Sequence, residues 1–424
     1  MGPLRTENGY NNDVINSMKL TQNINGVKGV CCLSYLKFYH PVSSTCIDYM
    51  HSVLEGVLKS LFSLWFQKEN NLSYSLKTYV NKIDARLLTI RPPKYVPTAP
   101  RSIKYWKTWR AHEYLSFLLF YSLPIFSDIM EIEQLDHFKK LCLFMQILLS
   151  KEIKQDDLDF AQMIIIEFVE KYKDFYGERN MLSGVHELLH LVHCTTDFGP
   201  LNLMNCFQFE ELNRKVVGLI HGRDLMAEEF IKIFNLIQGL NSNISSISPH
   251  TIFYDFIKNE IKFKTSNKKK VMKDNKNKRK LMKINELIDG NLRKAIKTKL
   301  SLTDEDIDRL YFYNKFIYND IIYTSSSIVT NFCDSSFITY TNKLGIIKHF
   351  FSYNSKDYVI GQKVLCLCNP FLCSESSERK ILTCICNLVE EYFVEELKNI
   401  KKTALIQVED KTYVSTFSIS HLSN

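Results

Sequence analysis

The fold of the first half of this chain is decided by the stretch Ile47-Asp-Tyr-Met-His-Ser-Val-Leu-Glu-Gly-Val-Leu-Lys-Ser-Leu-Phe-Ser-Leu-Trp-Phe66. From Val53 onward its apolar residues recur at the spacing of a helix face. Asp48 precedes them and belongs to the residue types that cap helix N-termini. The stretch therefore predicts a buried helix that begins near Asp48.

Downstream of this stretch the pattern stays helical. Residues 91–100 hold four prolines and are expected to form an extended connector, because proline removes backbone donors and fixes the backbone. Apolar residues at helical spacing then predict helices over residues 114–121, 135–149, 158–172 and 181–193. The sequence predicts an all-helical block in this region.

The residue pattern changes beyond residue 310, where short runs of β-branched and aromatic residues alternate with polar turns. Such runs are typical of strands. We therefore expect a helix-rich α+β fold with three parts: residues 1–240, a basic linker with a short helix over residues 241–300, and a small β-rich domain over residues 301–424.

Composition fits an intracellular globular protein. The 424 residues are 45% hydrophobic, enough for about two or three domains. The longest apolar stretch, residues 114–126, is interrupted by Pro124 and is shorter than the roughly 18 residues of a spanning helix, so no membrane association is expected. The N-terminus lacks the apolar run of a secretory signal, which favours an intracellular location.

The twelve cysteines are expected to be reduced thiols, because their density is far below that of a disulfide scaffold. Five of them cluster near the C-terminus, and a zinc site there remains an alternative to alternate positions on strands. These are Cys366, Cys368, Cys373, Cys384 and Cys386.

One segment carries the basic charge of the chain. Residues 258–283 contain eleven lysines and Arg279 against two acids, a local net charge of +10, whereas the whole chain has +8. The core of the segment lacks aromatic residues, so it suits phosphate contact or an importin-type nuclear signal; a solvated linker is the alternative. The residues expected to contact DNA are Lys268, Lys269, Lys270, Lys278, Arg279 and Lys280.

Two short motifs could carry chemistry. His186-Glu187-Leu-Leu-His190 has the spacing with which zinc peptidases place two imidazoles on one helix face beside a glutamate base. A structural pair of stacked histidines is the simpler alternative. Asp48 and His51 form an Asp-x-x-His pair, which on its own is explained by a helix cap. Glu210 is expected in the first turn of a later helix.

The context of these motifs resembles transposases of the CACTA (EnSpm) group, over about residues 5–221. The resemblance rests on an ordered set of short matches. They are Asn25-Gly-Val-Lys-Gly29, Ile47-Asp-Tyr-Met-His51, Val53-Leu-Glu-Gly-Val57, Trp65-Phe66, Arg91-Pro-Pro-Lys94, Pro100-Arg-Ser102, Tyr105-Trp-Lys107, Phe117-Leu-Leu-Phe-Tyr-Ser-Leu-Pro124, Tyr176-Gly-Glu178, Val185-His186, Leu189-His-Leu191, Gly199-Pro-Leu201, Cys206 and Phe209-Glu210.

The resemblance implies the later part of an RNase H-like catalytic domain, with a helical insertion over about residues 52–180. Glu210 would be the third catalytic carboxylate of a site whose acids clamp two divalent ions for phosphodiester cleavage and strand transfer. Asp48 and His51 would position groups at the edge of this site. His186 and His190 fall on the paired histidines of the family, which would make the peptidase pattern incidental.

Departures from the family weaken the expected activity. The family has Trp at the place of Asn202 and Pro at the place of Gln208, and its two earlier aspartates precede Gly-Val-Lys-Gly, where this chain offers only Glu7 and Asp13. One carboxylate cannot hold the metal pair. We also expect this chain to lack the DNA-binding module that such transposases carry near the N-terminus.

We therefore expect a truncated, transposon-derived protein without autonomous transposase activity and with weak DNA association. No cofactor should bind stably, and Mg²⁺ or Mn²⁺ would bind only to the full acid set. The zinc peptidase is the first alternative. The second is a non-catalytic nuclear protein whose β domain binds a partner that the sequence does not identify.

Overall fold

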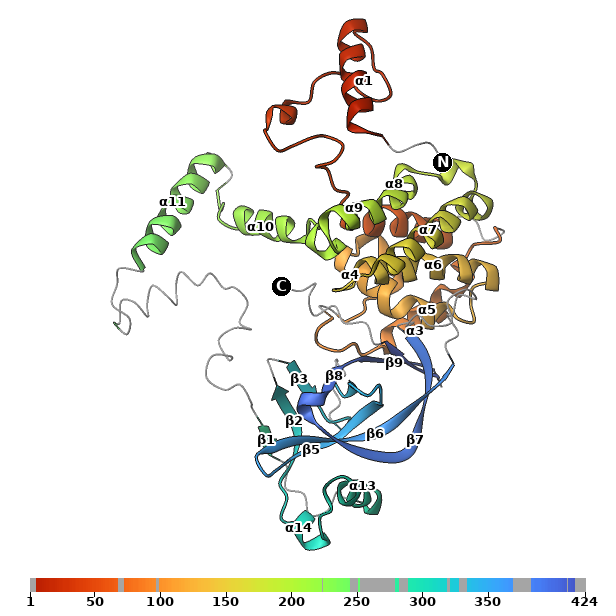
Figure 1. Cartoon of the computed structure of the whole chain (residues 1–424), viewed down its shortest axis with the longest axis vertical. Coiled ribbons are helices and arrows are strands. Elements are labelled where there is room, and N and C mark those ends of the chain that lie inside the picture. The colour runs from red at the N-terminus through yellow and green to blue at the C-terminus, as the bar shows by residue number, and fades with distance from the viewer. Residues whose placement is uncertain are drawn as a thin grey trace.

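The computed structural model describes residues 5–67, 72–96, 99–222, 224–244, 251, 279–281, 289–318, 321–327, 334–368, 383–409 and 411–415. A helical block occupies the upper part of the molecule in Figure 1, and a curved sheet lies below it. This arrangement confirms the expected helix-rich α+β fold. In the ranges just given, no helix is long and apolar enough to cross a membrane.

The stretch that begins at Asp48 forms the central helix of the block. Its first part, Met50–Leu58, is a π-helix, and it continues into α2 (Lys59–Phe66). The wider turn brings the backbone close to itself at Gly56, where an added Cβ would lie 2.9 Å from the carbonyl oxygen of His51. Only glycine leaves room for this approach.

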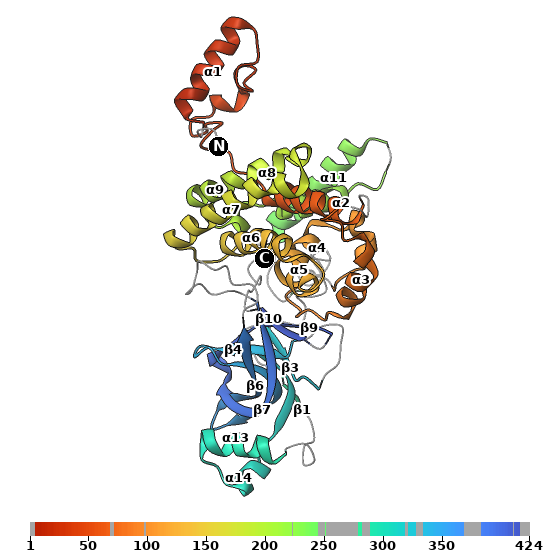
Figure 2. The same cartoon turned by 90° about the vertical axis from the view of Figure 1, so that its right-hand side faces the viewer.

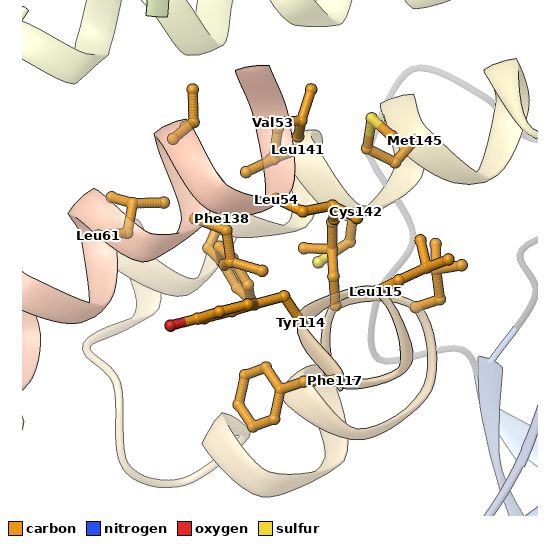
Figure 3. Packing of buried hydrophobic residues seen from close by; sticks show 14 of the residues in the cluster. Val53, Leu54, Leu61, Tyr114, Leu115, Phe117, Phe138, Leu141, Cys142 and Met145 are labelled. Carbon is orange, nitrogen blue, oxygen red and sulfur yellow. The ribbon is translucent and has the colours of Figure 1, made fainter. Parts of the chain in front are cut away.

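Among the residues described between 80 and 198, eight further α-helical or π-helical elements surround this helix or follow it, besides short 3₁₀ turns. They are α3 (Val80–Thr89), α4 (Ala111–Ser116), a π-helical turn (Phe117–Tyr121), α5 (Ser122–Phe126), α6 (Ile132–Leu148), α7 (Gln155–Tyr176), α8 (Ser183–Glu187) and α9 (Leu191–Phe198). Figure 3 shows side chains of the central helix, α4 and its π-helical turn, and α6 converging in one apolar core. The helices expected over residues 114–121, 135–149 and 158–172 correspond to α4 with its π-helical turn, α6 and α7, whereas the helix expected over residues 181–193 is divided into α8, a 3₁₀ turn and α9.

Among the described residues of 5–244, three helices lie outside this core or at its edge. α1 (Glu7–Leu20) projects from the block in both views of Figures 1 and 2. α10 (Phe207–Val217) has no buried residue, and α11 (Met226–Ile244) follows it as an arm that extends away from the block in Figure 1.

The second half of the chain forms one antiparallel sheet. In the part that the structure describes, its strands are β1 (Arg279–Leu281), β2 (Phe312–Tyr318), β3 (Ile321–Thr324), β4 (Ser336–Thr339), β5 (Leu344–Tyr353), β6 (Lys356–Cys368), β7 (Thr383–Glu396), β8 (Ile400–Lys402), β9 (Ala404–Val408) and β10 (Lys411–Ser415). The main path runs β1-β2-β5-β6-β7-β10-β9, with β3 beside β2 and β4 between β5 and β8.

Two short helices cover one end of the sheet. α13 (Gly290–Leu300) and α14 (Asp304–Asp308) share an apolar cluster with β2, β5 and β6, in which Ile296 packs with Phe351 and Ile360. The sequence places α13 in the linker, with a domain boundary at residue 300. In the structure, α13 packs on the sheet and belongs with it.

The hairpin of β9 and β10 joins the sheet to the helical block. Ala404, Ile406, Val408 and Tyr413 belong to the same apolar cluster as Trp65. Arg86 of α3, which is buried, donates hydrogen bonds to Asp128 and to Glu409 at the end of β9. The two halves of the chain thus share one core.

The RNase H-like assignment stays a hypothesis. Every element described between residues 52 and 180 is helical, as expected for the insertion. Among the described residues of 5–244, however, the only β-type pairing is the bridge between Ile24 and Val27, so the strands of such a domain are not represented there.

Candidate functional site

The site is built around Asp48, which lies just before the π-helix. Its Oδ1 accepts hydrogen bonds from the backbone N–H of Met50 at 3.2 Å and of Cys206 at 3.0 Å. Its Oδ2 accepts the backbone N–H of His51 at 3.1 Å and lies 2.5 Å from the Nδ1 of that residue. Asp48 is therefore the helix cap expected from the sequence, and it also contacts a segment 158 residues away.

His51 connects Asp48 to Glu210. The Nε2 atom of His51 lies 3.6 Å from Oε1 of Glu210, while Nδ1 faces Asp48 on the other side of the ring. The side chains of His51 and Glu210 are 57% and 59% exposed, whereas that of Asp48 is 17% exposed. The structure thus brings all three predicted site residues together at the surface of the helical block.

Glu210 reaches this position because α10 begins next to Asp48. The side-chain oxygen of Asn205 accepts the N–H of Phe207, and the Phe207 ring packs against Tyr49 with centroids 6.1 Å apart. These contacts fix the start of α10 against the start of the π-helix. Glu210 then lies in the first turn of α10, as the sequence predicts.

Cys206 completes the cluster and was not predicted as a site residue. The pKa of its thiol is raised by burial and by the charges and hydrogen bonding of Asp48, with Glu210 and Cys46 contributing further. Asp48, His51 and Cys206 each offer one ligand atom, and these atoms lie within 4.8 Å of one another. In the described parts of the chain, this is the one group of three such side chains that could hold a metal ion. A sequence signal for Cys206 existed, because it lies four residues before Glu210.

The histidine motif forms a separate pair. The Nε2 atoms of His186 and His190 are 3.1 Å apart, and the rings meet edge to face. Burial, followed by the charges of His186 and His193, lowers the pKa of His190. The helix is interrupted here, since α8 ends at Glu187 and a 3₁₀ turn follows. Among the described residues, no third side chain joins the pair to form a metal-binding group.

The other acids near the N-terminus lie elsewhere. Glu7 accepts a hydrogen bond from Ser43, and Asp13 accepts one from Asn25. Both are on α1, which projects from the block (Figure 2). Neither belongs to the metal-capable group at Asp48 among the described residues.

The predicted DNA contacts fall mostly outside the described residues. Lys268, Lys269, Lys270 and Lys278 are not described, whereas Arg279 and Lys280 form strand β1 at the edge of the sheet. Because β1 pairs with β2, residues 279–281 at the end of the basic segment belong to the sheet.

Part of the C-terminal cysteine cluster can be placed. Cys366 and Cys386 are register partners on β6 and β7, with their Sγ atoms 3.5 Å apart. Cys373 lies outside the described residues, as do the side chains of Cys368 and Cys384. Cys366 and Cys368 both lie on β6, with a register shift between them in the pairing with β7.

No family model, curated protein or solved structure matches this chain.

Proposed function

We propose that this chain is a transposase-derived, DNA-associated protein in which Asp48, His51 and Glu210 form part of a nuclease-type site that does not cleave DNA alone. The observation that carries the proposal is the convergence of these residues from two distant segments. The resemblance of the ordered motifs to CACTA transposases implies that the same residues belong to one site.

The contacts support different roles for the two acids. Both oxygens of Asp48 accept two contacts each, from three backbone N–H groups and the His51 ring. In the nuclease-type site we therefore assign Asp48 to positioning its neighbours rather than to holding the catalytic pair of divalent ions. Glu210 is exposed in the first turn of α10, where a carboxylate can reach an ion or a phosphate-bound metal. We therefore assign Glu210, rather than Asp48, as the catalytic carboxylate of the nuclease-type site.

The acid set at this site is incomplete for two-metal chemistry. Such chemistry needs about three carboxylates around two divalent ions. Around Asp48, the described residues offer two carboxylates, a histidine and a thiol. We infer that cleavage and strand transfer require acids from elsewhere, and that the chain by itself binds DNA without cutting it.

The zinc peptidase remains a second candidate because the two Nε2 atoms of the histidine motif face each other. It has less support, because the described residues supply no third ligand there and the helix is broken at Glu187. Loss of casein cleavage on Glu187→Ala would be its signature.

A non-catalytic interaction role for the β domain is the third candidate. Deletion of residues 310–424 would test it poorly, because Ala404, Ile406, Val408 and Tyr413 are part of the core of the helical block. Such a deletion would damage the helical block and the partner surface together.

DNA binding is expected to depend steeply on salt. Binding of a duplex by the full chain should lose about 0.9 log units of affinity per log unit of salt for each phosphate neutralised. Replacing Lys268, Lys269 and Lys270 with glutamine should lower this slope, which fluorescence anisotropy over a salt series measures. The same samples with Mg²⁺ or Mn²⁺ should leave plasmid DNA uncut.

The matched control replaces three exposed lysines of the helical block, Lys107, Lys151 and Lys173, and should leave the slope unchanged. A slope near zero for the unmodified chain would contradict the DNA association. Metal-dependent cutting of plasmid DNA that disappears on Glu210→Gln would contradict the proposal that the site does not cleave DNA alone.

A further inference from the structure

We propose that Asp48, His51 and Cys206 bind a Zn²⁺ ion that fastens the start of α10 to the start of the π-helix. This site departs from the sequence-based expectation that no metal binds stably. It does not depend on a transposase origin, because it rests only on the contacts of these three residues.

The geometry supplies three ligand atoms from two elements. Oδ2 of Asp48 and Nδ1 of His51 already face each other at 2.5 Å, and the ligand atoms of Asp48, His51 and Cys206 all lie within 4.8 Å of one another. Two ligands of one tetrahedral zinc ion are about 3.3 Å apart, given bond lengths of about 2.0 to 2.3 Å. A small rotation of the His51 ring therefore replaces its contact with Asp48 by a shared metal ion.

Glu210 acts as a positioning residue in this arrangement. When Nδ1 of His51 binds the metal, Nε2 carries the proton and points toward Oε1 of Glu210, 3.6 Å away. A carboxylate that accepts the second N–H of a metal-bound histidine fixes its tautomer and ring orientation. The fourth ligand is a water molecule, because His51 is exposed and solvent reaches the site.

The donor set selects zinc over the ions of nuclease chemistry. A thiolate is a soft ligand that favours Zn²⁺, whereas Mg²⁺ prefers oxygen ligands and retains water. On binding, the Cys206 thiol releases its proton to solvent and its sulfur forms the bond to zinc. Excess Mg²⁺ should therefore not displace the ion.

The ion would stabilise the base of the α10–α11 arm. α10 has no buried residue of its own, and its start is held by the N–H of Cys206, the Asn205 cap and the Phe207 ring. A zinc bond through Cys206 adds a strong link at the same point. Bound zinc should therefore slow amide hydrogen exchange at the start of α10.

The test is metal analysis of the full-length chain, purified without a histidine tag and dialysed against a small excess of Zn²⁺. We expect about one zinc per chain, and a cobalt-substituted sample with a thiolate-to-cobalt charge-transfer band. Cys206→Ser and His51→Ala should each lose the ion. Glu210→Gln should retain it with affinity weakened by about 10- to 100-fold.

Two control variants keep the site intact. Cys32→Ser removes an exposed thiol, and His186→Ala removes one member of the histidine pair. Both should keep the zinc and the cobalt spectrum. Zinc that is lost on His186→Ala but kept on Cys206→Ser would overturn the proposal, as would an unmodified chain that binds no zinc.

A cobalt spectrum of the unmodified chain that lacks a thiolate band excludes Cys206 as a ligand even where a variant fails to fold, and the Cys206→Ser variant assigns a band that is present. Failure here is distinguishable from failure of the proposed function. DNA binding is assigned to residues 258–283, which none of these substitutions changes.

Discussion

Trp65→Ala is expected to lower the free energy of unfolding by about 3 to 5 kcal/mol. Trp65 is fully buried and packs against Phe62, Phe126 and Phe138, with ring centroids 5.2 to 5.9 Å apart. Its Nε1–H donates a hydrogen bond to the hydroxyl of Tyr176 at 3.3 Å. The alanine would leave a cavity at the centre of the block and remove this donor. Urea unfolding followed by circular dichroism measures the loss.

Two comparisons separate packing from general effects of substitution. Trp65→Phe keeps an aromatic ring but loses the donor, so it should fall between the unmodified chain and the alanine variant. Tyr105→Ala removes a ring that is 65% exposed and should change stability by about 0.5 kcal/mol or less. An effect of Trp65→Ala as small as that of Tyr105→Ala would contradict the described core.

Asp334→Ala is expected to cost about 3 to 5 kcal/mol, because it removes one partner of a buried ion pair. Asp334 is 1% exposed and pairs with Lys402 of β8, while its Oδ1 also accepts the backbone N–H of Lys94 at 2.9 Å. Its loss would leave the buried ammonium of Lys402 without its counter-charge. It would also detach the proline-rich connector from the sheet. Chemical denaturation measures this effect.

A double substitution tests whether the uncompensated charge is the cause. Asp334→Ala combined with Lys402→Met should recover much of the loss, because a buried ion pair can be replaced by apolar groups at little cost. Lys363→Met breaks a more exposed pair with Glu391 and should cost less than about 1 kcal/mol. Equal losses for Asp334→Ala and Lys363→Met would contradict the burial of the pair.

The helices of the first half could be predicted because their signal is local. Apolar spacing over a few turns identifies α6 and α7, and Asp48 marks the start of the central helix. The π-helical form of Met50–Leu58 could not be predicted, because it depends on how Gly56 packs against the turn before it. The strand signals after residue 310 were local as well.

The connections between the two halves could not be predicted. Ala404-Leu-Ile-Gln-Val408 indicates a strand, but nothing in its pattern shows that Ala404 and Ile406 pack into the helical core. Likewise α13 has a linker-like composition, and only its contacts with Phe351 and Ile360 assign it to the sheet. Partners of this kind depend on tertiary packing.

The candidate site was predicted in part. The ordered motifs named Asp48, His51 and Glu210, and the structure brings them together. They did not name Cys206 as a site residue, because its contact with Asp48 depends on the path of the loop that follows Gly199. The thiol also changes the chemistry, because it favours zinc over the ions of a nuclease.

The contact between Asp48 and the start of α10 holds the candidate site together, and amide hydrogen exchange at Cys206 tests it directly. The N–H of Cys206 donates to Oδ1 of Asp48, so it should exchange slowly in the unmodified chain and in Asp48→Asn, which keeps an acceptor oxygen. It should exchange fast in Asp48→Ala, while the N–H of Glu210, bonded to the carbonyl of Cys206, reports whether α10 stays folded. Equal exchange at Cys206 in the unmodified chain and in Asp48→Ala, with the Glu210 amide still protected, would contradict the site.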